Sequence, residues 1–369
     1  MWHIATSMRP VLRTLLVVVV GAAGIVAGFA GGWFAHTSSS SSSGGPATLA
    51  VIAAGSLAPT PLLPSLISSF ANATPGVSAP TAAQLYEGSS AAATALAGGG
   101  QPYDAFVSAD FRVIPESLES GTSPVASWEV VFASDPLVLA FNNSSGSSMA
   151  GTTSTNWYEK VNQTGVILGT PNASADPLGV NAIIALELED SLEGLHGGLY
   201  GHFFSGGEGA LATPTSAVKI VTENTAGTAL QEGEVDAYLI YQSYAIADGL
   251  TYAKLSPAVN LAGTSSADVA AYGNASTKTL TSTGGTKTVV GAPILFALTV
   301  PSTAPDASLG LLFAAFLLSN TTATVWAHDG FTPLAPLWTD APSHLPAALG
   351  GSSPQGVASL PSYLQALIG

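Results

Sequence analysis

Two serine residues in the first quarter of the chain lie where an anion could bind. Ser56 follows the apolar, strand-like residues 48–54, and Ser89 follows the strand-like residues 83–86. A helical stretch comes after each serine, and the free N–H groups at a helix start attract negative charge. Each serine could instead be only a helix cap, which is worth about 1 kcal/mol. The pattern therefore indicates either an anion site or two capped helices.

Acidic residues stand at the start of two later helical stretches. Asp176 precedes a proline and the helical residues 180–188, and Glu223 follows the strand-like residues 218–221. An acid in this position is favoured by the helix dipole, and a proline just inside a helix is a common start signal. Taken alone, each acid is as well explained by a helix start as by a ligand. Tyr241 ends an apolar strand, where core packing is the simplest explanation.

The histidines show no catalytic or metal-binding pattern. No H-E-x-x-H motif, G-x-S-x-G elbow or P-loop is present in the sequence, so a hydrolase is disfavoured. We expect a binding protein with no catalytic activity and no cofactor. The histidines are His3, His36, His196, His202, His328 and His344.

Strand, turn and helix alternate along the chain, which predicts an α/β fold with two lobes, each built on a doubly wound sheet. The apolar residues 130–141 carry the chain from the first lobe into the second, and the strand-like residues 294–300 lead back. The helical residues 307–318 and 321–328 are expected to pack on the first lobe.

The composition excludes several partners. The net charge is −15 with only eight Lys and Arg, so the clustered cations that track nucleic-acid phosphates are missing. Cysteine is absent, which excludes disulfides, thiolate metal sites and a lipidated N-terminal cysteine. Charged residues make up only 8% of the chain. This scarcity suggests an acidic exterior, in which surface carboxylates are protonated, or simply a biased composition.

The N-terminal region predicts a membrane anchor. Residues 15–35 form an uncharged apolar stretch, and about 20 such residues span a bilayer as a helix. Arg9 and Arg13 precede the stretch, which places the N-terminus in the cytoplasm and the rest of the chain outside. We expect an uncleaved anchor rather than a cleaved signal peptide, followed by a flexible Ser/Gly-rich tether.

Seven N-x-S/T sequons agree with an exported glycoprotein, although a Ser/Thr/Asn-rich composition alone also produces them. They begin at Asn72, Asn142, Asn143, Asn162, Asn172, Asn274 and Asn320. The expected organisation is a cytoplasmic N-terminus (1–14), a transmembrane anchor or signal segment (15–35), a linker (36–46), lobe I (47–133), lobe II (134–302), and a return to lobe I with a C-terminal tail (303–369).

Seven short segments carry a resemblance to a known family. They are A-G-S-L at 54–57, E-G-S at 87–89, S-A-D-F-R-V-I-P at 108–115, N-W-Y at 156–158, D-P-L-G at 176–179, G-E-V-D-A-Y-L-I-Y-Q-S at 233–243 and T-V-P at 299–301. Each is weak alone, but the ordered set is specific and covers nearly all of the chain from residue 47 to about residue 338. The chain resembles the molybdate/tungstate-binding proteins of ABC importers, particularly the archaeal branch, within the type II periplasmic-binding-protein fold.

The resemblance implies a monomeric, extracytoplasmic solute-binding protein that delivers its ligand to an ABC permease and a cytoplasmic ATPase. In that family a tetrahedral oxyanion lies between the lobes, and in the archaeal branch two carboxylates also coordinate its metal. Matched position by position, Ser56 and Ser89 would supply turn hydroxyls, Asp176 and Glu223 the two carboxylates, and Tyr241 a phenolic O–H.

The chemistry of these residue types agrees with the implied site. Two carboxylates would repel an anion unless its centre is a metal that accepts further oxygen ligands. Sulfate and phosphate cannot do so, and the acids would therefore select against them. The chain departs from the family at Leu178, where the family has Cys, and at Asn181, where it has Arg. The alternatives are a same-fold binding protein for sulfate, phosphate or a metal ion, a hydrolase, and a structural surface domain.

Overall fold

Residues 45–59, 61–144, 146–207, 209–281, 283–350 and 356–368 are described by the computed structural model. The expected cytoplasmic segment (1–14), the anchor (15–35) and most of the linker (36–46) lie outside these residues. In the described part, no single helix is long and apolar enough to cross a membrane. Helices α10 (Ala307–Leu317) and α11 (Asn320–His328) satisfy the length and composition only together, and they bend by 61° at the break between them.

The larger sheet has seven strands and combines the N-terminal and C-terminal parts of the described chain. Its order is β18-β17-β6-β16-β5-β2-β4. Strand β2 runs parallel to β4 and β5, whereas β16 is antiparallel to β5 and β6. The strands are β2 (Val51–Ala54), β4 (Gln84–Glu87), β5 (Ala105–Ser108), β6 (Val130–Ser134), β16 (Leu295–Thr299), β17 (Thr332–Thr339) and β18 (Val357–Ser359).

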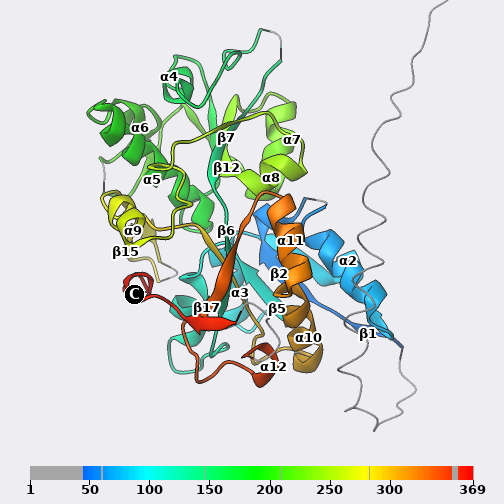
Figure 1. Ribbon diagram of the computed structural model, residues 1–369. Helices are drawn as coiled ribbons and strands as arrows, with labels where there is room; N and C mark the ends of the chain where they lie inside the picture. The colour runs from blue at the N-terminus through cyan, green and yellow to red at the C-terminus, as the bar shows by residue number, and fades with distance from the viewer. Residues whose placement is uncertain are drawn as a thin grey trace, which may run out of the picture. The chain divides into compact units, whose positions relative to one another are not determined.

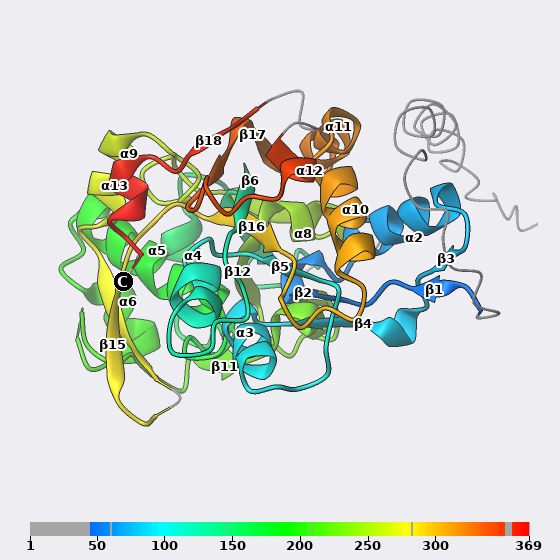
Figure 2. The same ribbon diagram turned by 90° about the horizontal axis from the view of Figure 1, so that it is seen from below.

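Helices cover this sheet, because its central strands are apolar on both faces. Every residue of β2, β5, β6 and β16 is buried. Helices α2 (Leu63–Ala73), α10 and α11 lie together on one side of the sheet in both views (Figures 1 and 2). Phe70 of α2 meets Phe313 of α10 edge to face, with ring centroids 5.2 Å apart.

The smaller sheet has five strands in the order β11-β8-β12-β7-β13. Strand β8 is parallel to β11 and β12, and β7 is antiparallel to β12 and β13. Figure 1 shows the helices α4 to α8 around β7 and β12. The strands are β7 (Leu137–Phe141), β8 (Leu168–Thr170), β11 (Val218–Ile220), β12 (Ala237–Tyr241) and β13 (Tyr252–Lys254).

The remaining elements are further helices and three two-stranded sheets. The helices are η1 (Gly55–Leu57), η2 (Thr81–Ala83), α3 (Ser89–Ala97), η3 (Pro115–Glu119), α4 (Trp157–Val161), α5 (Pro177–Glu193), α6 (Gly198–Phe203), η4 (Glu223–Thr225), α7 (Ala226–Gln231), α8 (Gln242–Ala247), α9 (Ser266–Tyr272), α12 (Ala347–Gly350) and α13 (Ser362–Gln365). The small sheets pair β1 (Ala47–Thr48) with β3 (Val77–Ser78), β9 (Phe204–Ser205) with β10 (Thr213–Pro214), and β14 (Ser276–Leu280) with β15 (Thr286–Val290).

The chain passes between the two large sheets at the predicted places. It leaves the larger sheet after Ser134, enters the smaller sheet at Leu137, and returns at Leu295. Asp135, in the first crossing, is fully buried and accepts a hydrogen bond from the Ser243 N–H (3.3 Å). The lobe boundaries at 133/134 and 302/303 remain a prediction about domain organisation.

The β14–β15 hairpin joins segments that belong to the two large sheets. On one strand, the Leu280 N–H donates to Ser174 Oγ (2.9 Å) in the loop after β8. On the other strand, the Val290 carbonyl accepts from Arg112 Nη1 (3.0 Å), and Lys287 pairs with Glu116 of η3. Figure 2 shows this hairpin at the edge of the molecule, in yellow. The sequence analysis did not predict the hairpin.

One local prediction was wrong. We expected a helical stretch directly after Ser56, but the structure has the short turn η1 and then α2, which begins at Leu63. Pro59 and Pro61 lie between them. Proline lacks an N–H and disfavours helical backbone at the preceding residue, so two prolines separate the turn from the helix.

Candidate functional site

A cavity of about 250 Å³ lies between loops of the two large sheets. Gly55, after β2, and Gly88, after β4, line it from the larger sheet. The smaller sheet contributes Asp176, which caps α5, and Glu223, which begins η4. None of the residues that line the cavity is Lys, Arg or His. The cavity therefore contains acids with no cation in its walls.

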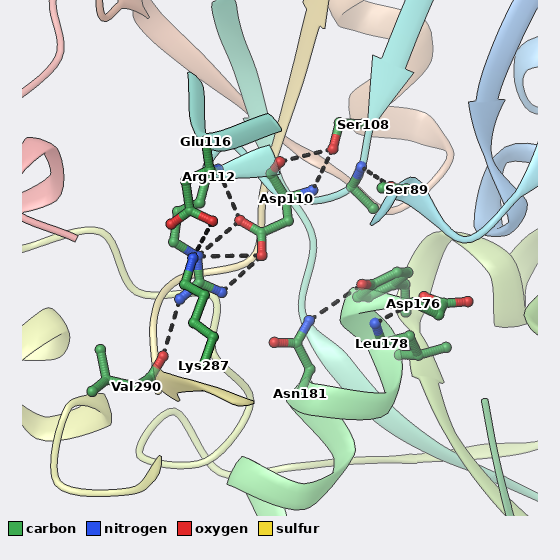
Figure 3. Close-up of polar contacts among 12 residues, drawn as sticks. Ser89, Ser108, Asp110, Arg112, Glu116, Asp176, Leu178, Asn181, Lys287 and Val290 are labelled. Carbon is green, nitrogen blue, oxygen red and sulfur yellow. Dashed lines mark hydrogen bonds and ion pairs between the residues drawn. The ribbon is translucent and has the colours of Figure 1, made fainter. Parts of the chain in front are cut away.

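Asp176 is both a helix cap and a wall of the cavity. Its Oδ1 accepts from the Leu178 N–H (3.0 Å), so the capping role considered from the sequence is present. The residue is 6% exposed. Burial raises the pKa of the carboxyl to about 7, although the Leu178 hydrogen bond opposes the shift. Oδ1 thus holds the side chain at the start of α5, while Oδ2 takes no part in the hydrogen bond with the Leu178 N–H (Figure 3).

Glu223 is the more strongly perturbed acid. The residue is 2% exposed, and its Oε1 has no hydrogen-bond partner among the described residues. Burial raises the pKa of Glu223 well above its usual value, and the charges of Asp176 and Asp135 raise it further. The N–H and O–H of Ser56 lie close enough to oppose this shift. Neither the N–H nor the O–H of Ser56 makes a hydrogen bond to Glu223 Oε1. Ser56 Oγ also has no well-formed hydrogen bond in the described chain.

The loops of the two sheets touch across the cavity. A Cβ added at Gly55 would lie 2.9 Å from Glu223 Oε2, and one at Gly88 would lie 2.8 Å from Asp176 Cβ. The Ala91 N–H, near the start of α3, donates to the Ala175 carbonyl (3.1 Å). Glycine at both turns is therefore required by the close approach to the two acids, because any side chain would collide with them.

Ser89 is placed less directly than Ser56. It is the first residue of α3, is 1% exposed, and its Oγ accepts from the Ala109 N–H (3.0 Å; Figure 3). It does not cap the helix and does not itself line the cavity, although its neighbour Gly88 does. The structure thus brings Ser56, Asp176 and Glu223 together and gives the Ser89 oxygen a structural contact.

Tyr241 lies behind the two acids at the end of β12. Its side chain is fully buried, and its hydroxyl accepts a hydrogen bond from Asn181 Nδ2 (3.2 Å). Burial raises the pKa of Tyr241, and the charges of Glu223 and Asp176 raise it further, so the phenol is held in its neutral form. A neutral phenol is a hydrogen-bond donor, which is the role that the resemblance implies for this residue.

The sequence analysis missed one buried ion pair beside this site. Arg112 is 6% exposed, and its Nε and Nη2 bind Asp110 at 3.0 and 2.7 Å (Figure 3). Burial alone would raise the pKa of Asp110, but the Arg112 charge and hydrogen bonds hold it below its usual value. Because Asp110 neutralises it, Arg112 adds no net charge for an anion. The only signal in the sequence was an arginine inside an otherwise uncharged segment at 111–115.

No group of three or more His, Asp or Glu side chains that could hold a metal ion occurs in the described ranges. Glu87 lines the same cavity as Asp176 and Glu223, but the three carboxylates do not form such a group.

Comparisons with known proteins agree on the class of protein. The family described as Bacterial extracellular solute-binding protein matches residues 49–332. A solute-binding protein of Methanoculleus marisnigri is 28% identical over 253 residues, which cover 64% of this chain and 69% of that protein. A molybdate/tungstate-binding protein of Thermococcus kodakarensis is 29% identical over 231 residues, covering 59% of this chain and 62% of that protein.

A solved structure supports the fold. The sulfate-binding protein SubI of Mycobacterium tuberculosis superimposes with a TM-score of 0.51, covers 86% of this chain and 96% of its own, and is 15% identical. At this identity the likeness concerns the fold and not the ligand.

Proposed function

Because this chain belongs to the bacterial extracellular solute-binding proteins, we propose that it captures molybdate or tungstate and delivers it to an ABC importer. Members of this family bind solutes and are not enzymes. The ligand and the delivery step are the parts that we propose. The similarity to the molybdate/tungstate-binding protein of Thermococcus kodakarensis supports the choice of ligand.

The observation that carries the proposal is the pair of buried acids in a cavity without cations. Asp176 and Glu223 face a cavity of about 250 Å³, and each carboxyl pays a desolvation penalty that raises its pKa. A simple anion would be repelled by these carboxylates, and the described residues include no group of three acids or histidines that could hold a bare metal ion. In a tetrahedral metal oxyanion, the metal carries four oxygens of its own and can accept two more from carboxylates. Such an ion therefore fits a cavity that has buried acids and no cation.

Donors for the oxygens of such an ion would come from Ser56, in the turn after β2, and from Tyr241, at the end of β12. Ser56 Oγ is buried and has no well-formed hydrogen bond in the described structure, although its O–H lies close enough to Glu223 to oppose the rise of that residue's pKa. The turn hydroxyl of Ser56 and the phenol of Tyr241 would bind oxygens, while the two acids would bind the metal centre. We assign Ser89 a weaker part, since its oxygen already accepts from Ala109.

Calorimetry with tungstate, molybdate, sulfate and phosphate tests this proposal on the purified protein. We expect sulfate to bind at least a hundredfold more weakly than tungstate, which corresponds to about 2.7 kcal/mol. The double variant Asp176→Asn, Glu223→Gln keeps the shape and removes both charges, and it should lose most of the tungstate affinity. Equal affinity for sulfate and tungstate, or a double variant with unchanged tungstate affinity, would contradict coordination of the metal by the two acids. Either result would indicate a plain tetrahedral anion site.

The remaining parts of the proposal concern the cell. We propose that residues 15–35 anchor the protein in the membrane, with the binding domain outside as a monomer, and that a permease with a cytoplasmic ATPase accepts the ligand. The support is the uncharged apolar stretch after Arg9 and Arg13. Fractionation of cells that express the full chain tests the anchor, and recovery of a soluble form without residues 1–35 from cells that received no protease would overturn it.

A further inference from the structure

Hydrogen bonds cross the cavity beside each of the paired acids. The bond beside Asp176 joins backbone groups of α3 and of the loop before α5 (3.1 Å). The bond beside Glu223 depends on a side chain, because Asn224 Nδ2 donates to the Tyr86 carbonyl (3.4 Å). Both Asn224 and Tyr86 line the cavity. A substitution at Asn224 therefore removes one contact between the two loops and leaves both acids in place.

The Tyr86 carbonyl belongs to an edge strand. Strand β4 is the last strand in the order of the larger sheet, and an edge strand has backbone groups that no neighbouring strand pairs. A carbonyl oxygen can only accept a hydrogen bond, so the Asn224 amide must turn an N–H towards it. The turn η4, which carries Asn224, packs against β4 and η1. The bond thus ties a loop of the smaller sheet to the edge of the larger one.

Asn224 differs from the neighbouring acid in its exposure. Glu223 is buried, whereas Asn224 is exposed at the rim of the cavity. When the loops are apart, the Asn224 amide and the Tyr86 carbonyl can both bind water instead, so the net gain from their bond is small. That gain is made only in the conformation in which the loops touch. The side chain therefore stabilises the closed cavity through contacts within the protein.

We propose that Asn224 is a positioning residue that holds the cavity closed over the bound ligand and so sets how long the ligand stays. The inference rests on the proposed function for the identity of the ligand. The bond forms after the ligand has entered, so it slows dissociation and leaves association unchanged. Because protein groups form both ends of the bond, molybdate and tungstate should be retained by the same factor. A residue that contacts the ligand would instead discriminate between them.

Stopped-flow kinetics with sodium tungstate and sodium molybdate test this inference. The chain has no cysteine, so a dye can be attached at Thr228→Cys, an exposed position on α7. Asn224→Ala should raise the dissociation rate of both ligands about twofold to fivefold, the size of one net hydrogen bond, with an unchanged association rate. Asn162→Ala, at an exposed turn after α4, is the matched control and should change neither rate.

A second variant separates the hydrogen bond from the loss of side-chain size. Asn224→Asp keeps the shape but places an oxygen against the Tyr86 carbonyl, and salt screens its added charge. At high salt it should raise the dissociation rate at least as much as Asn224→Ala. An unchanged dissociation rate in Asn224→Ala, or a change for only one of the two ligands, would overturn the inference.

A ligand-free measurement distinguishes failure of this inference from failure of the proposed function. Nitroxide labels at Ala97→Cys on α3 and Thr228→Cys on α7, both exposed positions, report the separation of the two sides by pulsed electron paramagnetic resonance. In the empty protein, Asn224→Ala should increase the population with the longer distance. Identical distance distributions would overturn the role of Asn224 whatever the ligand. A shifted distribution in a protein that binds neither tungstate nor molybdate would reject the proposed ligand and keep the closing contact.

Discussion

Gly88→Ala tests whether the contact across the cavity belongs to the ligand-bound state. The φ of Gly88 is −56°, so the backbone accepts alanine without strain. The new Cβ would lie 2.5 Å from the Ala175 carbonyl oxygen and 2.8 Å from Asp176 Cβ. Real Cβ atoms essentially never approach closer than 3.0 Å, so the two loops must separate by about half an ångström or more.

The size of the expected effect follows from that collision. Forcing an extra methyl into a filled contact costs about 1–3 kcal/mol, which corresponds to a roughly 5- to 150-fold loss of affinity. This free-energy cost applies only to the conformation in which the two loops touch. The stability of a conformation with the loops apart does not change. Calorimetric titration of Gly88→Ala with tungstate should therefore show weaker binding, while thermal unfolding of the empty protein changes little.

Gly201→Ala provides the matched control. Gly201 lies in α6, and a Cβ added there meets nothing within 4 Å. Alanine is also preferred to glycine inside helices, so this variant should bind tungstate like the wild type and unfold at the same or a slightly higher temperature. Unchanged affinity in Gly88→Ala, with both variants folded, would refute the reasoning and show that the loops are apart when the ligand is bound.

Four further outcomes are expected. Burial raises the pKa values of Glu119 and Asp135 to about 8 and about 7. The contribution of these two groups to the stability of the empty protein should therefore be complete below about pH 4 and be lost as the pH rises through 7 to 8. Glu129→Gln should raise the melting temperature at pH 8 but not at pH 4, because both buried oxygens of Glu129 are unpartnered in the described structure and burial raises its pKa. Tungstate affinity should fall as the pH drops through about 7, where Asp176 becomes protonated, and this slope should be reduced in Asp176→Asn. Phe313→Ala, at a fully buried position, should cost about 3–5 kcal/mol in urea unfolding.

Much of the fold could be predicted from the sequence, because hydrophobic periodicity and turn residues act locally. The strand predicted at residues 237–241 is β12 (Ala237–Tyr241), and the helix predicted at 307–318 is α10 (Ala307–Leu317). These segments have long apolar runs with clear start signals. The β14–β15 hairpin was not predicted, since its strands are largely exposed and polar, and Thr and Lys give no clear alternation.

The candidate site could be predicted only in part. The sequence placed Asp176 and Glu223 at helix starts, and the structure puts both beside one cavity. Their approach to Gly55 and Gly88 depends on contacts between segments that are far apart in the sequence, which no local pattern encodes. The same is true of the Asn181–Tyr241 bond, which joins α5 to the end of β12. The role of each proposed ligand residue stays a prediction.

The hairpin that joins the two sheets makes the opening of the cavity sensitive to the salt content of the medium. One of its links, between Lys287 and Glu116, is a partly exposed ion pair, and such pairs contribute about 0–1 kcal/mol and weaken as ions screen them. A second link, from buried Arg112 to the Val290 carbonyl, is shielded from dissolved ions, and the third, from the Leu280 N–H to Ser174 Oγ, joins uncharged groups. In dilute surroundings all three links oppose separation of the sheets, whereas in brine the ion pair is weakened. Release of the ligand should accordingly be faster in brine than in fresh water.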